Sequence, residues 1–226
     1  MSGFWQAVTA VVRKDLTIER HTGQSISVMV VFALAVVVTF NLALGGDLDA
    51  ARSVSVGLLW ATILLAGTLG LNRSFAAEQE NNSFDALLMG PVDRSAIFLG
   101  KVVSVSLLMF ALELILIVVF TAFFNKPFYL PAAVLVLVLG TIGYVAAGVL
   151  VTSMAMQTRA RAVLIPVLLL PLTLPVVLSA ASAMATILDT AVLAWDEVGF
   201  SLSLVVLFDV LMLAVGLLTY QFVVED

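Results

Sequence analysis

Six long apolar stretches dominate this chain, and each is close to the roughly 20 residues that an α-helix needs to cross the hydrocarbon core of a bilayer. A backbone in lipid must satisfy its polar groups internally, which a helix does within one segment. The stretches cover roughly Ser25–Leu44, Val54–Leu71, Val102–Phe124, Leu130–Met156, a run from Ala162 past Pro175, and Gly199–Val224. The pattern predicts an all-α membrane protein with six transmembrane helices.

The overall composition also indicates a lipid environment. Hydrophobic residues make up 62% of the chain and charged residues 11%, whereas soluble domains have about 45–50% and about 25%. So few charges could not cover that much apolar surface in water. The 226 residues therefore suit a single transmembrane domain, 1–226.

The lysine and arginine residues predict an orientation. Eight of the ten lie before the first span, between the second and third, or between the fourth and fifth, and only Arg52 and Lys126 fall on the other side. Cytoplasmic loops carry the excess of positive charge. We therefore expect a multi-pass protein with both termini in the cytoplasm.

Residues 1–24 precede the first span and predict a helix lying in the cytoplasmic interface. Trp5 would anchor this helix among the lipid headgroups, with Arg13 and Arg20 on its polar side. The alternative is a frayed cytoplasmic tail. The apolar residues recur at helical spacing: Phe4, Val8, Val11, Val12 and Leu16.

The cytoplasmic loop 72–101 contains the most informative soluble segment. Within it, Phe75–Met89 predicts an amphipathic helix that Gly90 and Pro91 end. Such a helix could enter a groove on a cytoplasmic motor domain and couple it to the membrane part; an ordinary interfacial loop helix is the alternative. The apolar stripe would be Phe84, Leu87 and Leu88, and the polar side Glu78, Glu80 and Asp85.

Sites for catalysis or for tight cofactor binding are not evident. Gly100 and Lys101 are followed by Val102, without the glycine that a phosphate-binding loop requires. Any ATP hydrolysis would belong to a separate ATPase polypeptide, and this chain would not be an enzyme. With no cysteine and His21 as the single histidine, thiolate and multi-histidine metal sites are excluded.

Two carboxylates and three prolines interrupt the apolar spans. Glu113 and Asp209 are expected near the membrane midplane and facing the bundle interior, either in a functional role or as polar contacts between helices. Pro166, Pro171 and Pro175 predict a kinked fifth span. That span would end near Leu178 and be followed by a short re-entrant or outer-surface segment; one long tilted helix is the alternative.

Several stretches resemble the family of cytochrome c maturation protein B, also called heme exporter protein B, within the ABC-2-type permeases. The most specific is Leu170–Pro175, with the sequence Leu-Pro-Leu-Thr-Leu-Pro. The others are Phe4–Arg20, Glu78–Pro91, Gly100-Lys101, Leu139–Gly143 and Arg159–Arg161, so the resemblance covers nearly the whole chain.

The resemblance implies a membrane component of an ABC complex for system I cytochrome c biogenesis, in the bacterial inner membrane. Its partners would be the ABC ATPase (cytochrome c maturation protein A), the haem-handling membrane protein C, the small membrane protein D and the haem chaperone E. Haem would be a transported or handled ligand, not a tightly bound cofactor. ATP hydrolysis would drive release of the haem-loaded chaperone.

Two other functions stay open from the residues themselves. One is an ABC-2 permease that exports another lipid, a drug or a polysaccharide. The other is a membrane scaffold that binds partners and transports nothing.

Overall fold

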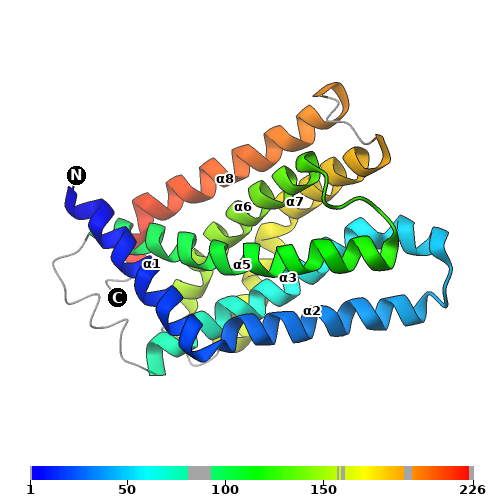
Figure 1. Ribbon diagram of the computed structural model, residues 1–226. Coiled ribbons are helices and arrows are strands. Elements are labelled where there is room, and N and C mark those ends of the chain that lie inside the picture. Colours follow the sequence, from blue (N-terminus) through cyan, green and yellow to red (C-terminus); the bar gives the residue numbers. More distant parts are fainter. Residues whose placement is uncertain (1, 81–92, 157, 159–160, 191–194, 224–226) are drawn as a thin grey trace.

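The apolar stretches form helices that match the predicted spans. The computed structural model describes residues 2–80, 93–156, 158, 161–190 and 195–223. In these residues six helices are long and apolar enough to cross a membrane, and they lie side by side in one bundle (Figure 1). They are α2 (Gln24–Ala43), α3 (Leu48–Glu80), α5 (Arg94–Phe124), α6 (Pro131–Ala155), α7 (Arg161–Thr190) and α8 (Trp195–Val223). The predicted all-α membrane fold is confirmed.

The N-terminal segment is a separate helix, α1 (Ser2–Thr22), which packs against the first turns of α5. Gly23 ends it in the left-handed conformation, with φ +58°, which glycine adopts without steric cost. The carboxylate of Glu19 then accepts hydrogen bonds from the backbone N–H groups of Ser25 (3.3 Å) and Ile26 (2.8 Å) and caps α2. The predicted N-terminal helix is confirmed, and its position in the membrane interface stays a prediction.

Helices α3 and α6 are the most buried spans, and glycines allow them to approach closely. Each glycine lies opposite a large side chain of the other helix, so that an added Cβ would collide with that side chain. The pairs are Gly140 with Trp60, Gly67 with Tyr144, and Gly148 with Leu71. This interlocking places α6 in the middle of the bundle, in contact with α3, α5, α7 and α8.

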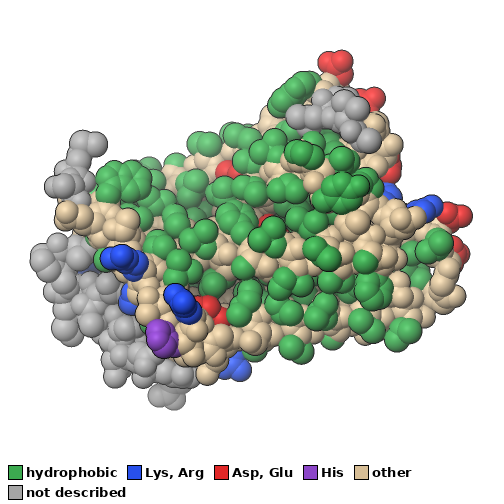
Figure 2. All heavy atoms as spheres, in the orientation of Figure 1, with side chains coloured by type: hydrophobic (Ala, Val, Ile, Leu, Met, Phe, Trp, Pro, Cys, Tyr) green, Lys and Arg blue, Asp and Glu red, His purple; other side chains and the backbone are tan. Residues whose placement is uncertain are grey.

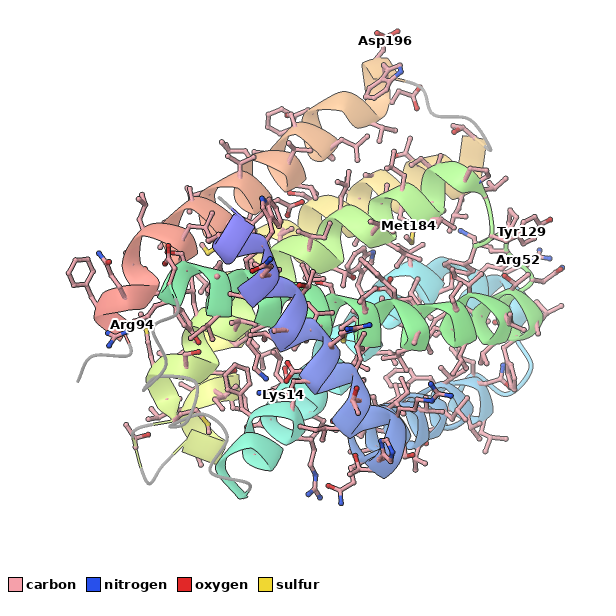
Figure 3. All side chains as sticks on the ribbon, turned by 60° about the vertical axis from the view of Figure 1, so that its left-hand side comes forward. Lys14, Arg52, Arg94, Tyr129, Met184 and Asp196 are labelled. Atoms are coloured by element: carbon pink, nitrogen blue, oxygen red, sulfur yellow. The ribbon has the colours of Figure 1, made fainter. Side chains whose placement is uncertain are left out.

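Apolar side chains cover the middle of the visible face, and charged side chains gather mostly toward its two ends (Figure 2). Arg94 lies at one end, whereas Arg52 and Tyr129 lie at the other (Figure 3). We call the first the basic end and define it by Arg13, Arg20, Arg73 and Arg94. At the opposite end, Lys126 Nζ lies 3.0 Å from Asp189 Oδ1 and joins the α5–α6 turn to α7.

The fifth span differs from the favoured prediction. It does not end near Leu178, because α7 continues as one helix to Thr190 with all three prolines inside it. Four buried residues at helical spacing, Ala180, Ala183, Met184 and Ile187, keep the second half of α7 packed on the bundle. Membrane helices tolerate proline where neighbouring groups compensate the lost donor. The re-entrant segment is therefore wrong, the long helix is right, and a kink at Pro166, Pro171 and Pro175 stays a prediction.

The loop between the second and third spans is also shorter than expected. Helix α3 continues past Leu71 to Glu80, because Leu71 and Phe75 are both buried one turn apart. Helix α5 already begins at Arg94, where the Asp93 side chain accepts a hydrogen bond from the backbone N–H of Ser95 at 3.0 Å. The expected helix Phe75–Met89 therefore does not begin as a separate element at Phe75, and 72–80 and 94–101 extend the flanking spans.

Candidate functional site

The residues predicted to contact an ATPase fall on both sides of the limit of the described chain. Glu78 and Glu80 belong to the last turn of α3. The remaining members of the predicted contact lie in 81–92, outside the described residues: Phe84, Asp85, Leu87, Leu88, Gly90 and Pro91. Their role in coupling stays a prediction.

A buried ion pair joins α1 to α5. Lys101 Nζ lies 2.9 Å from Asp15 Oδ2, and the lysine side chain is wholly buried. The hydroxyl of Ser104 donates a hydrogen bond to the same Asp15 oxygen at 2.7 Å. Lys14 lies 3.2 Å from the other oxygen, Oδ1. Both carboxylate oxygens of Asp15 are thus compensated.

Helix α3 contributes an aromatic ring to this cluster. Lys101 Nζ lies 5.1 Å from the ring centroid of Phe75, which is a cation–π distance. Phe75 is itself wholly buried. We call Asp15, Lys101, Ser104 and Phe75 the three-helix cluster.

The three-helix cluster sets the protonation state of its carboxylate. Burial raises the pKa of Asp15, but the positive charges of Lys101 and Lys14 and the hydrogen bonds from Lys101 and Ser104 outweigh it and hold this pKa below its usual value of 3.8. Asp15 is therefore ionised at neutral pH, and the pair is a true ion pair.

Close packing of α1 on α5 depends on a glycine next to the lysine. A Cβ added at Gly100 would lie 2.7 Å from the Cβ of Val11 and 3.2 Å from the carbonyl oxygen of Val8. Because 2.7 Å is too short for a real Cβ contact, Gly100 lets α1 lie directly on α5. Gly100 and Lys101, expected in a loop, are therefore interior residues of a helix interface.

Two members of the three-helix cluster flank the segment 81–92 in the sequence. Phe75 lies in the last two turns of α3 before it, and Lys101 lies in the second turn of α5 after it. Lys101 contacts the Asp15 carboxylate of α1, and the Phe75 ring contacts Lys101. A displacement of either flank therefore acts on the contacts that hold α1.

The two carboxylates predicted in the bundle interior are buried on either side of α6. The hydroxyl of Thr141 on α6 donates a hydrogen bond to Glu113 Oε1 on α5. Asp209 on α8 lies against Gly143, where an added Cβ would collide with its carboxylate. Glu113 and Asp209 thus both contact the central helix, and their functional role stays a prediction.

A tyrosine on α6 supplies a further polar contact inside the bundle. The hydroxyl of Tyr144 donates to the carbonyl oxygen of Leu64 at 3.0 Å and lies 3.0 Å from Thr68 Oγ1. Because both partners are on α3, this contact joins the two most buried spans. It complements the interlocking of Gly67 with the Tyr144 ring.

Side chains able to ligate a metal do not gather in the described part of the chain. No group of three or more histidine, cysteine, aspartate or glutamate residues is present there. His21 is exposed, with its Nδ1 2.8 Å from the carbonyl oxygen of Thr17. No imidazole lies inside a span.

The pairing of Asp15 with Lys101 was not predicted from the sequence. The sequence does contain an indication that Asp15 is buried, because this residue continues the apolar series Phe4, Val8 and Val11 on one face of α1. A carboxylate on a face that packs against protein requires a compensating charge. Lys101 was assigned to the cytoplasmic loop 72–101, and for this reason it was not considered as the partner of Asp15.

The chain is similar to known proteins along nearly its whole length. The family model described as CcmB protein matches residues 6–223. Heme exporter protein B of Bradyrhizobium diazoefficiens is 31% identical over 181 residues, which cover 78% of this chain and 80% of that protein. Heme exporter protein B of Rhodobacter capsulatus is 28% identical over 74% of this chain and 77% of that protein. The Pseudomonas aeruginosa protein of the same name is 26% identical over 68% of this chain and 70% of that protein.

Proposed function

The chain belongs to the CcmB protein family, and from this premise we propose that it is the permease-like membrane subunit of an ABC complex for cytochrome c biogenesis. Haem is the handled or exported ligand. The subunit works in the bacterial inner membrane with both termini in the cytoplasm. The observation that carries the proposal is the match of nearly the whole chain to a family whose similar members are named heme exporter protein B.

Hydrolysis of ATP takes place on a separate polypeptide, the ABC ATPase known as cytochrome c maturation protein A. It binds the cytoplasmic segment between α3 and α5, with Phe84 and Leu88 as apolar anchors. The haem-handling membrane protein C and the small membrane protein D complete the membrane complex. Hydrolysis drives release of the haem-loaded chaperone E on the outer face.

The three-helix cluster supports a mechanical part for this segment. Because the buried Lys101 contacts both Asp15 and Phe75, a movement imposed by the ATPase on the end of α3 or the start of α5 reaches α1. Tight haem ligation by this chain is not part of the proposal, because its one imidazole, His21, is exposed on α1.

Purification of the tagged protein from bacterial membranes, followed by identification of the co-purifying chains, tests the proposal. We expect an ATPase together with haem-handling membrane proteins. An ATPase without haem-handling proteins would favour a permease for another substrate. Recovery of neither would contradict the proposal.

A further inference from the structure

An apolar groove of about 480 Å³ opens on the side of the bundle between α2 and α3. Leu69 of α3 lines one side, and five residues of α2 line the other: Ser27, Val28, Val31, Phe32 and Ala35. Val31 is 68% exposed, and α2 is the least buried of the six spans. The groove therefore faces the surroundings of the bundle, which for a membrane-spanning helix is lipid.

The dimensions of this α2–α3 groove suit a hydrocarbon chain. From Ser27 to Ala35 the groove follows nine residues of α2, which span about 12 Å of helix length. Its walls are apolar apart from Ser27 at the end nearest α1. A single acyl chain lying along α2 would cover these side chains.

A cation lies at the same end of the groove. Arg73 follows Leu69 by four residues on α3, so the two side chains share one face of the helix about one turn apart. Arg73 is exposed, and the ion pairs found among the described residues do not include it. Its position toward the basic end allows the guanidinium to reach the headgroup region while its methylene groups stay beside the apolar wall.

The last turn of α1 adds positive charge to this corner. Arg20 is exposed there, three residues before Gly23, where the chain turns into α2. The neighbouring Glu19 is engaged with the backbone N–H groups of α2. Guanidinium groups match the geometry of phosphate oxygens, and basic groups at a membrane surface attract anionic lipids.

A second groove, between α6 and α8, provides an internal contrast. It is of similar size, about 540 Å³, and is lined by apolar residues that include Leu207 and Trp195. Carboxylates, Asp196 and Glu197, follow Trp195 directly at the start of α8. Charge complementarity with an anionic headgroup is therefore a property of the α2–α3 groove and not of the α6–α8 groove.

We propose that the α2–α3 groove is a binding site for an anionic phospholipid, with one acyl chain along Val31 and Leu69 and the phosphate bound by Arg73, assisted by Arg20. The bound lipid fills the corner where α1, α2 and α3 meet. The site does not depend on the proposed role in haem export.

Native mass spectrometry of the full-length protein, titrated in detergent with phosphatidylglycerol or phosphatidylcholine, tests the proposal. We expect the wild type to bind phosphatidylglycerol more tightly than phosphatidylcholine. Arg73→Gln should weaken phosphatidylglycerol binding about fivefold, the effect of one basic group near a lipid surface. Val31→Trp should abolish the preferred site for both lipids by filling the groove. Both residues are exposed, and unchanged helicity of each variant will show that the fold is intact.

Two matched variants serve as controls. Arg52→Gln removes an arginine from the opposite end of the same helix α3, and Leu207→Trp fills the α6–α8 groove. Neither should change the preference for phosphatidylglycerol. The proposal is overturned if Arg73→Gln has no larger effect than Arg52→Gln, or if Val31→Trp has no larger effect than Leu207→Trp.

Discussion

The Nζ atom of Lys101 lies 2.9 Å from Oδ2 of Asp15, although the lysine is wholly buried and the two residues belong to different helices. Asp15 is in α1, which precedes the spans, and Lys101 is in the second turn of α5. A buried ion pair is strongly destabilised when only one partner is removed, because the other charge is left without compensation. We therefore expect loss of either partner to weaken the packing of α1 on the bundle.

Replacement of Lys101 by methionine should release α1. Asp15 would keep its contacts with Lys14 and Ser104 but lose its buried partner charge, and breaking a buried pair costs up to about 3–5 kcal/mol. The chain has no cysteine, so a single cysteine at Val11, which is 2% exposed, reports whether α1 is in place. We expect this cysteine to react with a thiol reagent in Lys101→Met but not in the wild-type background.

Two variants control the Lys101 experiment. Arg13→Gln removes an exposed charge from the same helix and should leave the cysteine protected. Asp15→Asn combined with Lys101→Met removes both charges and should restore part of the protection. A cysteine at Val11 that stays unreactive in Lys101→Met would show that the ion pair does not hold α1.

The ion pair also predicts that the stability of the folded protein decreases at acidic pH. Since the pKa of Asp15 in the folded protein lies below its usual value of 3.8, the folded state favours the ionised form. The resulting stabilisation is complete above the usual pKa and is lost as the pH falls through the lower folded value. Thermal unfolding in detergent at decreasing pH should therefore show a steeper acid loss in the wild type than in Asp15→Asn. Equal slopes would contradict the assignment.

The length of the apolar runs was sufficient to predict the spans. Six runs of adequate length specified six helices because a membrane leaves no other regular solution for such segments. The ends of the spans were harder to predict. Helix α3 extends to Glu80, with Phe75 buried in contact with Lys101 of α5. The predicted end of the fifth span, near Leu178, was wrong for a related reason. Proline is a strong local signal, whereas the packing of Ala183 and Ile187 that continues the helix is a tertiary one.

The interior carboxylates were predicted, but their partners were not. Glu113 and Asp209 stood out as acids in apolar runs, whereas nothing in the sequence links Thr141 to Glu113 or Gly143 to Asp209. Only the packing of α5 and α8 on opposite sides of α6 brings each acid to its neighbour.

The contact between Asp209 and Gly143 predicts a non-additive pair of substitutions. Gly143→Ala places a Cβ against the carboxylate and 3.0 Å from the Phe208 ring. Overpacking of this kind costs about 1–3 kcal/mol. In the Asp209→Ala background the same substitution should cost clearly less, measured by thermal unfolding. Gly57→Ala, where an added Cβ meets nothing within 4 Å, is the matched control and should be close to neutral. Equal costs in both backgrounds would contradict the contact.

The two carboxylates also permit a test of whether ionisation matters. Glu113→Gln and Asp209→Asn retain shape and hydrogen-bonding capacity while removing titration. If both groups serve packing, complex assembly and the yield of cytochrome c should change little. A large loss of yield with intact assembly would instead assign a functional role to ionisation.

The last prediction concerns the coupling contact. Phe84 and Leu88 lie in the predicted apolar stripe of the cytoplasmic segment, and buried aromatic and aliphatic anchors dominate contacts of this type. Phe84→Ala should therefore weaken association with the ATPase by about 2 kcal/mol or more. Removal of charge at Asp85 should have a smaller effect that shrinks with added salt, as expected of a solvent-exposed rim. Phe84→Ala should still insert into the membrane normally, so loss of the ATPase on purification should accompany loss of cytochrome c maturation. Retention of the ATPase at the wild-type level would exclude this segment as the principal coupling element and direct attention to Arg13 and Arg20 on α1.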